Sequence, residues 1–270
     1  MPELPEVETV VRALRQPLIG ATIVEMHCSW PKQLVTPAEA EFRARIHGCR
    51  VESINRRAKY LLFSLTEGET LIIHLKMTGH LAVVPAGTPP DKFVHTYFDL
   101  ADGRQLRFRD MRKFGRLYLV KDPAAILHQL GPEPLEDAFT PAVAAERLSG
   151  SRRAIKTLLL DQTRIAGIGN IYADEALFAA GIHPERLADT LSQPELTALH
   201  GAIRKVLQLG IDREGASISN YVHPDGTKGD MQNAVAVFRR TGFPCYDCGT
   251  TIERIVLGGR STHFCPHCQH

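Results

Sequence analysis

The chain opens on a helical pattern of apolar residues and then changes to a strand pattern. One helix face is predicted over residues 5–15, ended by Pro17, from four apolar positions at helical spacing: Val7, Val10, Val11 and Leu14. Between residues 21 and 121 the period becomes two, with hairpin turns predicted at Glu67-Gly68 and Asp102-Gly103. This alternation predicts a mostly antiparallel β-sandwich or flattened barrel.

Helical spacing returns after the Pro- and Gly-bearing stretch 131–134, where we expect a hinge. Helices are predicted over 154–160, 173–180 and 192–210, the last with Ser192 and Glu195 placed for a capping box. The predicted fold is therefore an α+β multidomain protein. Its expected parts are an N-terminal β-sandwich domain (1–130), a helical domain (131–235) with a flexible loop at about 214–230, and a cysteine-rich hairpin (236–270).

Four cysteines near the end of the chain have the spacing of a zinc site. The pairs Cys245-x2-Cys248 and Cys265-x2-Cys268 are separated by 16 residues, and four thiolates can close a tetrahedral site. One structural zinc ion is predicted, because four cysteines leave no open coordination position. Two disulfides are the alternative, and His263, His267 and His270 are competing ligands.

The net charge of +2 does not by itself indicate whether the protein binds nucleic acid, so we consider how the charged residues are distributed along the chain. Several basic clusters in one near-neutral chain favour a track for a polyanion. No apolar run is long enough for a membrane helix, and the acidic opening is unlike a signal peptide, so a cytoplasmic protein is expected. The clusters are Arg56, Arg57 and Lys59; Arg104, Arg107, Arg109, Arg112, Lys113 and Arg116; Arg152, Arg153 and Lys156; Arg239 and Arg240.

Five sequence motifs and the cysteine hairpin, in this order, resemble the bacterial formamidopyrimidine-DNA glycosylases. The motifs are MPELPEVETV (1–10), RAKYLL (57–62), HLKMTG (74–79), DMRKFG (110–115) and GIGNIYADE (167–175). The resemblance implies a β-sandwich N-terminal domain, a helix-two-turns-helix domain and a zinc finger. It also implies a bacterial base excision repair enzyme that excises oxidised purines such as 8-oxoguanine and formamidopyrimidines from double-stranded DNA. Such an enzyme would be a monomer, associated with the nucleoid when bound to DNA.

The N-terminus suggests the chemistry of this enzyme. If Met1 is removed, Pro2 becomes a secondary amine, which can form only a cationic iminium with the sugar C1′. This Schiff base would acidify the C2′ hydrogen and lead to β,δ-elimination, the lyase reaction. By resemblance Glu3 is the general acid/base, Glu6 holds the opened sugar, and Lys59 is counted with the catalytic residues. Without the other motifs, Pro2, Glu3 and Pro5 would only start a helix.

Further residues are assigned to DNA by the resemblance. A flipped-out base leaves a gap that must be filled, and Met77, Arg112 and Phe114 match the wedge residues that fill it. Arg112 and Phe114 lie two apart in a strand-like segment and are expected to share one face. The remaining DNA contacts are His74, Lys156, Asn170 and Arg260, of which the last three are assigned to phosphates. The loop at 214–230 resembles a lid over the flipped base.

Two other functions remain open at the level of the sequence. One is a glycosylase of the endonuclease VIII type, which takes oxidised pyrimidines. The other is a non-catalytic zinc-ribbon protein that binds DNA, in which the proline-glutamate start is only a helix cap.

Overall fold

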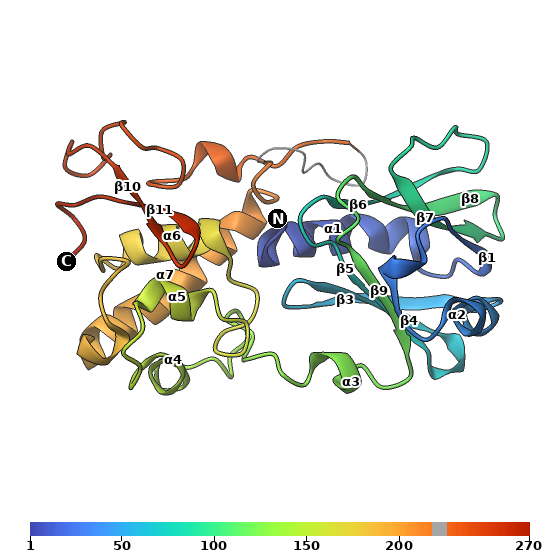
Figure 1. Ribbon diagram of the computed structural model, residues 1–270, viewed down its shortest axis with the longest axis horizontal. Helices are drawn as coiled ribbons and strands as arrows, with labels where there is room; N and C mark the ends of the chain where they lie inside the picture. The colour runs from blue at the N-terminus through green and yellow to red at the C-terminus, as the bar shows by residue number, and fades with distance from the viewer. Residues whose placement is uncertain (218–225) are drawn as a thin grey trace. The chain divides into compact units, whose positions relative to one another are not determined.

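Figure 1 shows the computed structural model, which describes residues 1–217 and 226–270. The chain forms two compact units. The first comprises Met1–His128 with Glu214–Asp230, and the second comprises Gln129–Arg213 with Met231–His270. The predicted hinge at 131–134 therefore lies close to the point where the first unit ends.

Helix α1 (Leu4–Leu18) begins the first unit and buries the predicted apolar face. Pro5 lies in its first turn, where a missing N–H costs no helical hydrogen bond. The prediction that Pro17 ends the helix was wrong, because Pro17 lies inside the last turn and the helix continues to Leu18. Leu18 is fully buried in the core, and this burial favours continuation of the helix to Leu18 despite the proline at position 17.

Two sheets share one hydrophobic core, which confirms the predicted sandwich. The four-stranded sheet has the order β1 (Ile23–Cys28), β7 (Val94–Leu100), β8 (Arg104–Asp110) and β6 (Gly79–Pro85). The five-stranded sheet has the order β2 (Leu34–Thr36), β9 (Arg116–Val120), β5 (Thr70–His74), β4 (Tyr60–Leu65) and β3 (Val51–Arg57). All named pairs are antiparallel except β2 with β9, and α1 packs on β3, β4 and β6.

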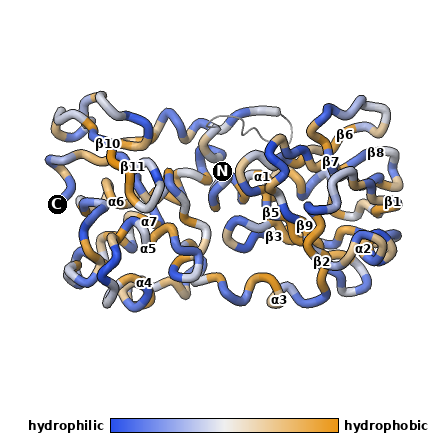
Figure 2. The backbone as a smooth tube through the Cα atoms, in the orientation of Figure 1, coloured by the Kyte–Doolittle hydropathy of each residue, from blue (hydrophilic) through white to orange (hydrophobic). Residues whose placement is uncertain are grey.

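Both predicted hairpin turns are present, at Glu67-Gly68 between β4 and β5 and at Asp102-Gly103 between β7 and β8. Figure 2 shows hydrophobic residues along the strands of this unit and more hydrophilic residues in their connections. Helix α2 (Glu39–Ile46), helix α3 (Ala124–Leu127) and strands β2 and β6 were not predicted. Short 3-10 turns lie at η1 (Pro31–Gln33), η2 (Thr66–Gly68), η3 (Ala188–Thr190) and η4 (Met231–Asn233).

The second unit combines helices with a β-hairpin, as expected. Its helices are α4 (Pro141–Leu148), which was not predicted, α5 (Ile155–Leu159), α6 (Asn170–Ala179) and α7 (Gln193–Asp212). The capping box at the start of α7 is confirmed: the Glu195 carboxylate accepts from Ser192 N at 2.7 Å, and Ser192 Oγ accepts from Glu195 N at 3.4 Å. The hairpin consists of β10 (Glu253–Leu257) and β11 (Arg260–Phe264). Helix α6 packs against both α7 and β11.

The segment after α7 returns to the first unit, whereas the sequence placed it with the helical domain. The lid assigned to 214–230 falls in part on residues 218–225, which lie outside the described residues. Among the described residues, no helix is long and apolar enough to cross a membrane.

Candidate active site and nucleic-acid interface

The start of the chain is held in place by buried carboxylates. Pro2, Glu3 and Glu6 are all buried. Glu3 N donates to Glu6 Oε2 at 2.8 Å, and Ala216 N donates to Glu6 Oε1 at 2.8 Å. A side chain on Gly215 would meet the Glu6 side chain at 2.9 Å, so only glycine allows this close approach. The Glu6 carboxylate thus joins the first residues of the chain to the segment that follows α7.

Lys59 lies in the tight turn between β3 and β4, and its side chain is buried. Ala58 adopts a positive φ of 52° in this turn. Arg56 connects the turn to α1, because its Nε lies 3.1 Å from Glu8 Oε2 and its Nη1 donates to Ala58 O at 3.1 Å. The helix that carries Pro2 and Glu3 near its start therefore also positions the turn that carries Lys59.

His74 ends β5 and is buried beside Tyr60, with ring centroids 4.5 Å apart. Burial, followed by the charges of Lys76 and Lys59, lowers the pKa of His74 to about 3. Its Nδ1 accepts from Lys76 N at 3.0 Å, so the neutral ring carries its proton on Nε2. His74 is therefore a neutral hydrogen-bond donor at physiological pH.

The three predicted wedge residues lie together in the first unit. Arg112 Nη1 lies 3.1 Å from Met77 Sδ, and the Arg112 guanidinium lies 4.6 Å from the centre of the Phe114 ring. Met77 and Phe114 are 42% and 44% exposed, so two large apolar side chains lie accessible beside one guanidinium. The interpretation of Arg112 and Phe114 as parts of a strand-like segment was wrong, because both lie in the turn between β8 and β9 and Lys113 has a φ of 59°. Their proximity comes from this turn.

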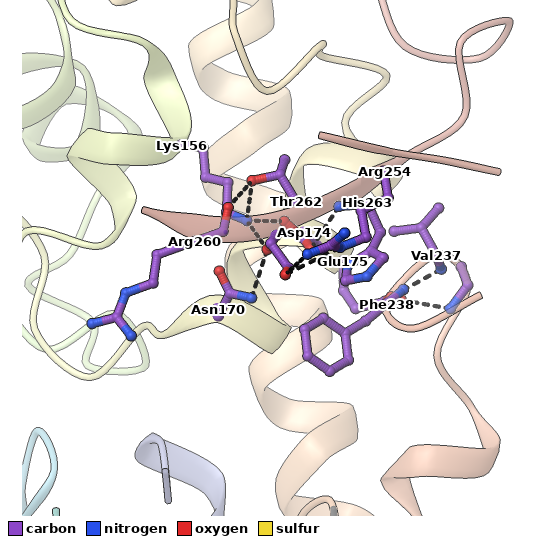
Figure 3. Close-up of polar contacts among 12 residues, drawn as sticks. Lys156, Asn170, Asp174, Glu175, Val237, Phe238, Arg254, Arg260, Thr262 and His263 are labelled. Atoms are coloured by element: carbon purple, nitrogen blue, oxygen red, sulfur yellow. Dashed lines mark hydrogen bonds and ion pairs between the residues drawn. The ribbon is translucent and has the colours of Figure 1, made fainter. Parts of the chain in front are cut away.

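Lys156 lies in a buried polar network of the second unit (Figure 3). Its side chain is 0% exposed, and its Nζ lies 2.6 Å from Asp174 Oδ1. The same Nζ donates to Thr262 Oγ1 at 2.7 Å and to Ser261 O at 3.0 Å. This burial does not agree with the expected direct contact of Lys156 with phosphate. The ammonium instead joins α5 and α6 to β11.

Asn170 and Arg260 surround this network. Asn170, the first residue of α6, donates from Nδ2 to Ser261 O at 2.8 Å. Arg260 begins β11 after the turn at Gly258-Gly259, where both glycines have positive φ, and its exposed side chain extends away from the network (Figure 3). Arg260 is therefore accessible to phosphate, and Asn170 is held against the hairpin that carries it.

The four cysteines of the quartet converge, with all four sulfur atoms within 4.8 Å of one another. Cys245 Sγ lies 3.9 Å from Cys268 Sγ, and Cys248 Sγ lies 3.5 Å from Cys265 Sγ. Thiolates at about 2.3 Å from a zinc ion would lie ~3.8 Å from one another in a tetrahedron. The arrangement fits one structural zinc ion. Among the described residues, this cluster of ligand atoms comprises the four cysteines and no histidine, and the Nδ1 of His263 lies 3.0 Å from Asp174 Oδ2.

Three family models match consecutive parts of the chain. The formamidopyrimidine-DNA glycosylase N-terminal domain matches residues 1–117, and the formamidopyrimidine-DNA glycosylase H2TH domain matches residues 130–222. The zinc finger found in FPG and IleRS matches residues 242–270. This chain belongs to the formamidopyrimidine-DNA glycosylase family.

Similar members of the family come from several bacteria. The formamidopyrimidine-DNA glycosylase of Chloroflexus aggregans is 51% identical, covering 100% of this chain and 98% of its own. That of Bacillus subtilis is 45% identical, covering 100% and 99%. A Lactococcus lactis FPG mutant in complex with Fapy-dG-containing DNA matches with a TM-score of 0.94 and 37% identity over 100% of both chains. The MutM (FPG) protein of Thermus thermophilus matches with a TM-score of 0.91 and 41% identity over 99% and 98%.

No role was predicted from the sequence for two acidic residues of the GIGNIYADE motif, Asp174 and Glu175, which form several buried contacts. Asp174 accepts from His263 N at 3.0 Å in addition to its pair with Lys156. Glu175 accepts three backbone N–H bonds at 2.7–3.0 Å, from residues 236–238. Burial raises the pKa of Glu175, although these three donors oppose the shift. An acidic pair inside an apolar helix was the available signal, because buried carboxylates require partners.

Proposed function

We propose that this chain is a bifunctional DNA glycosylase and AP lyase of base excision repair that excises oxidised purines, with Pro2 as its nucleophile. The observation that carries the proposal is the family match over the whole chain, together with Pro2 and Glu3 buried at the start of α1. Solved structures of similar proteins hold Fapy-dG or carbocyclic 8-oxo-G DNA. Duplex DNA with such a lesion is the proposed substrate here as well.

The reaction follows from the chemistry of a secondary amine. After Met1 is removed, the Pro2 nitrogen attacks C1′, the bond from C1′ to the base breaks, and the base leaves with a proton. Glu3 moves the protons at the sugar ring oxygen and the amine as the ring opens to a cationic iminium. Loss of the C2′ proton then expels the 3′ phosphate, and a second elimination expels the 5′ phosphate. Glu6 holds the opened sugar and Lys59 assists beside it.

The other site residues bind the DNA in this proposal. Met77, Arg112 and Phe114 fill the gap left by the flipped base, which costs about a few kcal/mol to extrude. His74 donates from Nε2, and Arg260 and Asn170 contact phosphates. Lys156 acts on phosphate only indirectly, by holding the Ser261 carbonyl that Asn170 also contacts.

Sodium borohydride tests the nucleophile, because it reduces the iminium to a stable amine. The enzyme should be trapped on an 8-oxoguanine duplex with the adduct on Pro2 in peptide mass analysis, and Pro2→Gly should lower trapping and strand scission by at least about 100-fold. Glu52→Gln, an exposed carboxylate on β3, is the matched control. An adduct on a lysine with residue 2 unmodified, or full activity of a chain that retains Met1, would exclude this assignment.

We further propose that the enzyme acts as a monomer and associates with the nucleoid through DNA. One chain carries the nucleophile, the wedge and the phosphate-binding residues, which favours a complex of one enzyme with one lesion. Sedimentation of the enzyme with a lesion duplex should give this stoichiometry, and a two-to-one complex would contradict it.

A further inference from the structure

The Asp110 carboxylate lies at the base of the wedge and is 0% exposed. Asp110 is the last residue of β8 and pairs in the sheet with Gly79, the first residue of β6. Its Oδ1 accepts from Thr78 Oγ1 at 2.5 Å and from Arg112 N at 3.2 Å. Its Oδ2 accepts from Gly115 N at 2.7 Å. A buried carboxylate with these partners is costly to displace, so the three donors are fixed relative to one another.

These donors belong to two different turns. Thr78 follows Met77 in the turn between β5 and β6, whereas Arg112 and Gly115 lie in the turn between β8 and β9 that also carries Phe114. The turns are also linked directly, because Arg112 N lies 3.1 Å from Thr78 Oγ1. Thr78, Asp110 and Arg112 N therefore form one hydrogen-bonded cluster that spans both wedge turns.

The backbone of the second turn is fixed from its other side as well. Arg116 Nη1 donates to Gly115 O at 2.9 Å, to Phe114 O at 3.1 Å and to Lys113 O at 3.4 Å. Lys113 lies with its ammonium 4.3 Å from the centre of the Trp30 ring. The Asp110 carboxylate thus accepts hydrogen bonds from N–H groups of this turn, and the Arg116 guanidinium donates hydrogen bonds to its carbonyl groups.

Steric contacts place both turns against the same aromatic ring. A Cβ on Gly115 would meet Phe108 Cζ at 2.3 Å, and a Cβ on Gly79 would meet Phe108 Cε2 at 2.8 Å. Lys76 and Lys113 both adopt positive φ, at 53° and 59°, which residues with a Cβ seldom do without external restraint. The turns are therefore held in one conformation by contacts outside the wedge side chains.

We propose that Asp110 is a positioning residue that holds the two wedge turns in register and thereby sets the selectivity of the enzyme for the base opposite the lesion. The inference rests on the proposed function of Arg112, Met77 and Phe114. Arg112 offers only donors. The pairing edge of cytosine presents two adjacent acceptors, N3 and O2, beside its amino donor, whereas that of adenine presents one acceptor, N1, beside its amino donor. Discrimination between them requires that the guanidinium be fixed, and its backbone is fixed through Asp110.

The first experiment measures whether Asp110 holds the turns in the DNA-free enzyme. Hydrogen exchange of the peptides that cover 76–80 and 110–116 should be faster by about tenfold or more in Asp110→Asn, because the amide group turns a donor toward a backbone N–H. Thr78→Val should speed exchange in the same two peptides, and Thr78→Ser should restore it. Asp91→Asn is the matched control, since Asp91 pairs with Arg109 outside both turns. Unchanged exchange in both Asp110→Asn and Thr78→Val would overturn the proposal.

The second experiment measures the consequence for selectivity in single-turnover cleavage of 8-oxoguanine opposite cytosine and opposite adenine. Asp110→Asn should bring the ratio of the two rates to within about threefold of one and slow cleavage opposite cytosine by ~10- to 100-fold. A pre-formed abasic site opposite a one-nucleotide gap presents no opposite base, so Asp110→Asn should cleave it within about threefold of the wild-type rate. A merely structural defect would instead lower the cleavage rates of the 8-oxoguanine duplex and of the gapped abasic substrate by the same factor.

Arg112→Ala separates the two hypotheses. If it abolishes the cytosine preference while Asp110→Asn retains it, the positioning role of Asp110 is wrong and the assignment of Arg112 holds. If Arg112→Ala retains the preference, the proposed role of Arg112 is wrong, and so is the selectivity that we assign to Asp110, whatever the exchange data show.

Discussion

Two buried aspartates, one in each unit, organise in different ways the elements that carry the proposed DNA-binding residues. Asp110 lies in the first unit and accepts hydrogen bonds from a hydroxyl and two backbone N–H groups. Asp174 lies in the second unit and pairs with the Lys156 ammonium and the His263 ring. The first carboxylate is satisfied by neutral donors in turns, and the second by a fully buried lysine, a histidine and a backbone N–H.

The difference shows how the same side chain serves two tasks. Neutral donors fix the backbone of short turns and leave the side chains of Met77, Arg112 and Phe114 exposed. An ion pair joins helices to a hairpin that has little core of its own and depends on a metal. Removal of one partner should therefore affect local order and selectivity in the first unit, and the stability of the assembled fold in the second.

Loss of the zinc ion should have the largest effect, and it should be confined to the second unit. Structural zinc contributes about 10–16 kcal/mol to the folding of small zinc domains, so Cys268→Ser should unfold the hairpin. We expect DNA affinity to fall at least about 100-fold. Differential scanning calorimetry should lose one transition and retain that of the first unit. Cys28→Ser, which changes a thiol outside the quartet, is the control, and equal affinity of both variants for DNA would contradict the prediction.

Asp174→Asn should lower the free energy of unfolding more than Asp110→Asn does. A buried lysine left without its carboxylate costs about 3–5 kcal/mol, whereas an unsatisfied buried hydrogen bond costs about 1–3 kcal/mol. Urea denaturation of both variants measures the difference. The double variant Lys156→Met/Asp174→Asn should be more stable than the sum of its single changes implies. Strict additivity would show that the pair is not coupled.

Salt titration of DNA binding tests whether Lys156 contacts phosphate. Each phosphate contact contributes about 0.9 to the slope of log affinity against log salt concentration. Arg260→Gln should reduce the slope by this amount, because its side chain is exposed. Lys156→Met should leave the slope unchanged, since its Nζ is held by Asp174 and Thr262. A slope reduced equally in both variants would restore Lys156 as a direct phosphate ligand.

The pH dependence of stability should show the smallest effect, through His74. The unfolded chain binds a proton on this histidine near pH 6.5, but the folded protein does so only near pH 3, because burial lowers the pKa. Acidification from pH 6.5 toward pH 3 therefore favours the unfolded state, by at most about 1.4 kcal/mol per pH unit, and has no such effect above pH 7.5. His74→Gln should remove this slope from urea denaturation curves, while His47→Gln gives the contribution of an exposed imidazole. Parallel curves for wild type and His74→Gln would contradict the assignment.

Local patterns in the sequence determined much of this protein. The period of two predicted the sandwich, Glu67-Gly68 and Asp102-Gly103 predicted its turns, and Ser192 with Glu195 predicted a helix start. The spacing of the cysteines predicted a metal site that the sulfur positions fit. These features depend on residues that are close in the chain, or on a repeated motif, so they can be predicted without knowledge of the fold.

Only the tertiary structure decided what the charged residues do. Lys156 belongs to a basic cluster in the sequence, yet its partner Thr262 lies 106 residues away and removes it from solvent. Asp110 accepts from Thr78 across 32 residues, and the turn conformation that results replaced the predicted strand at Arg112 and Phe114. Burial and pairing of a charge depend on which distant segments meet, and no local pattern encodes that.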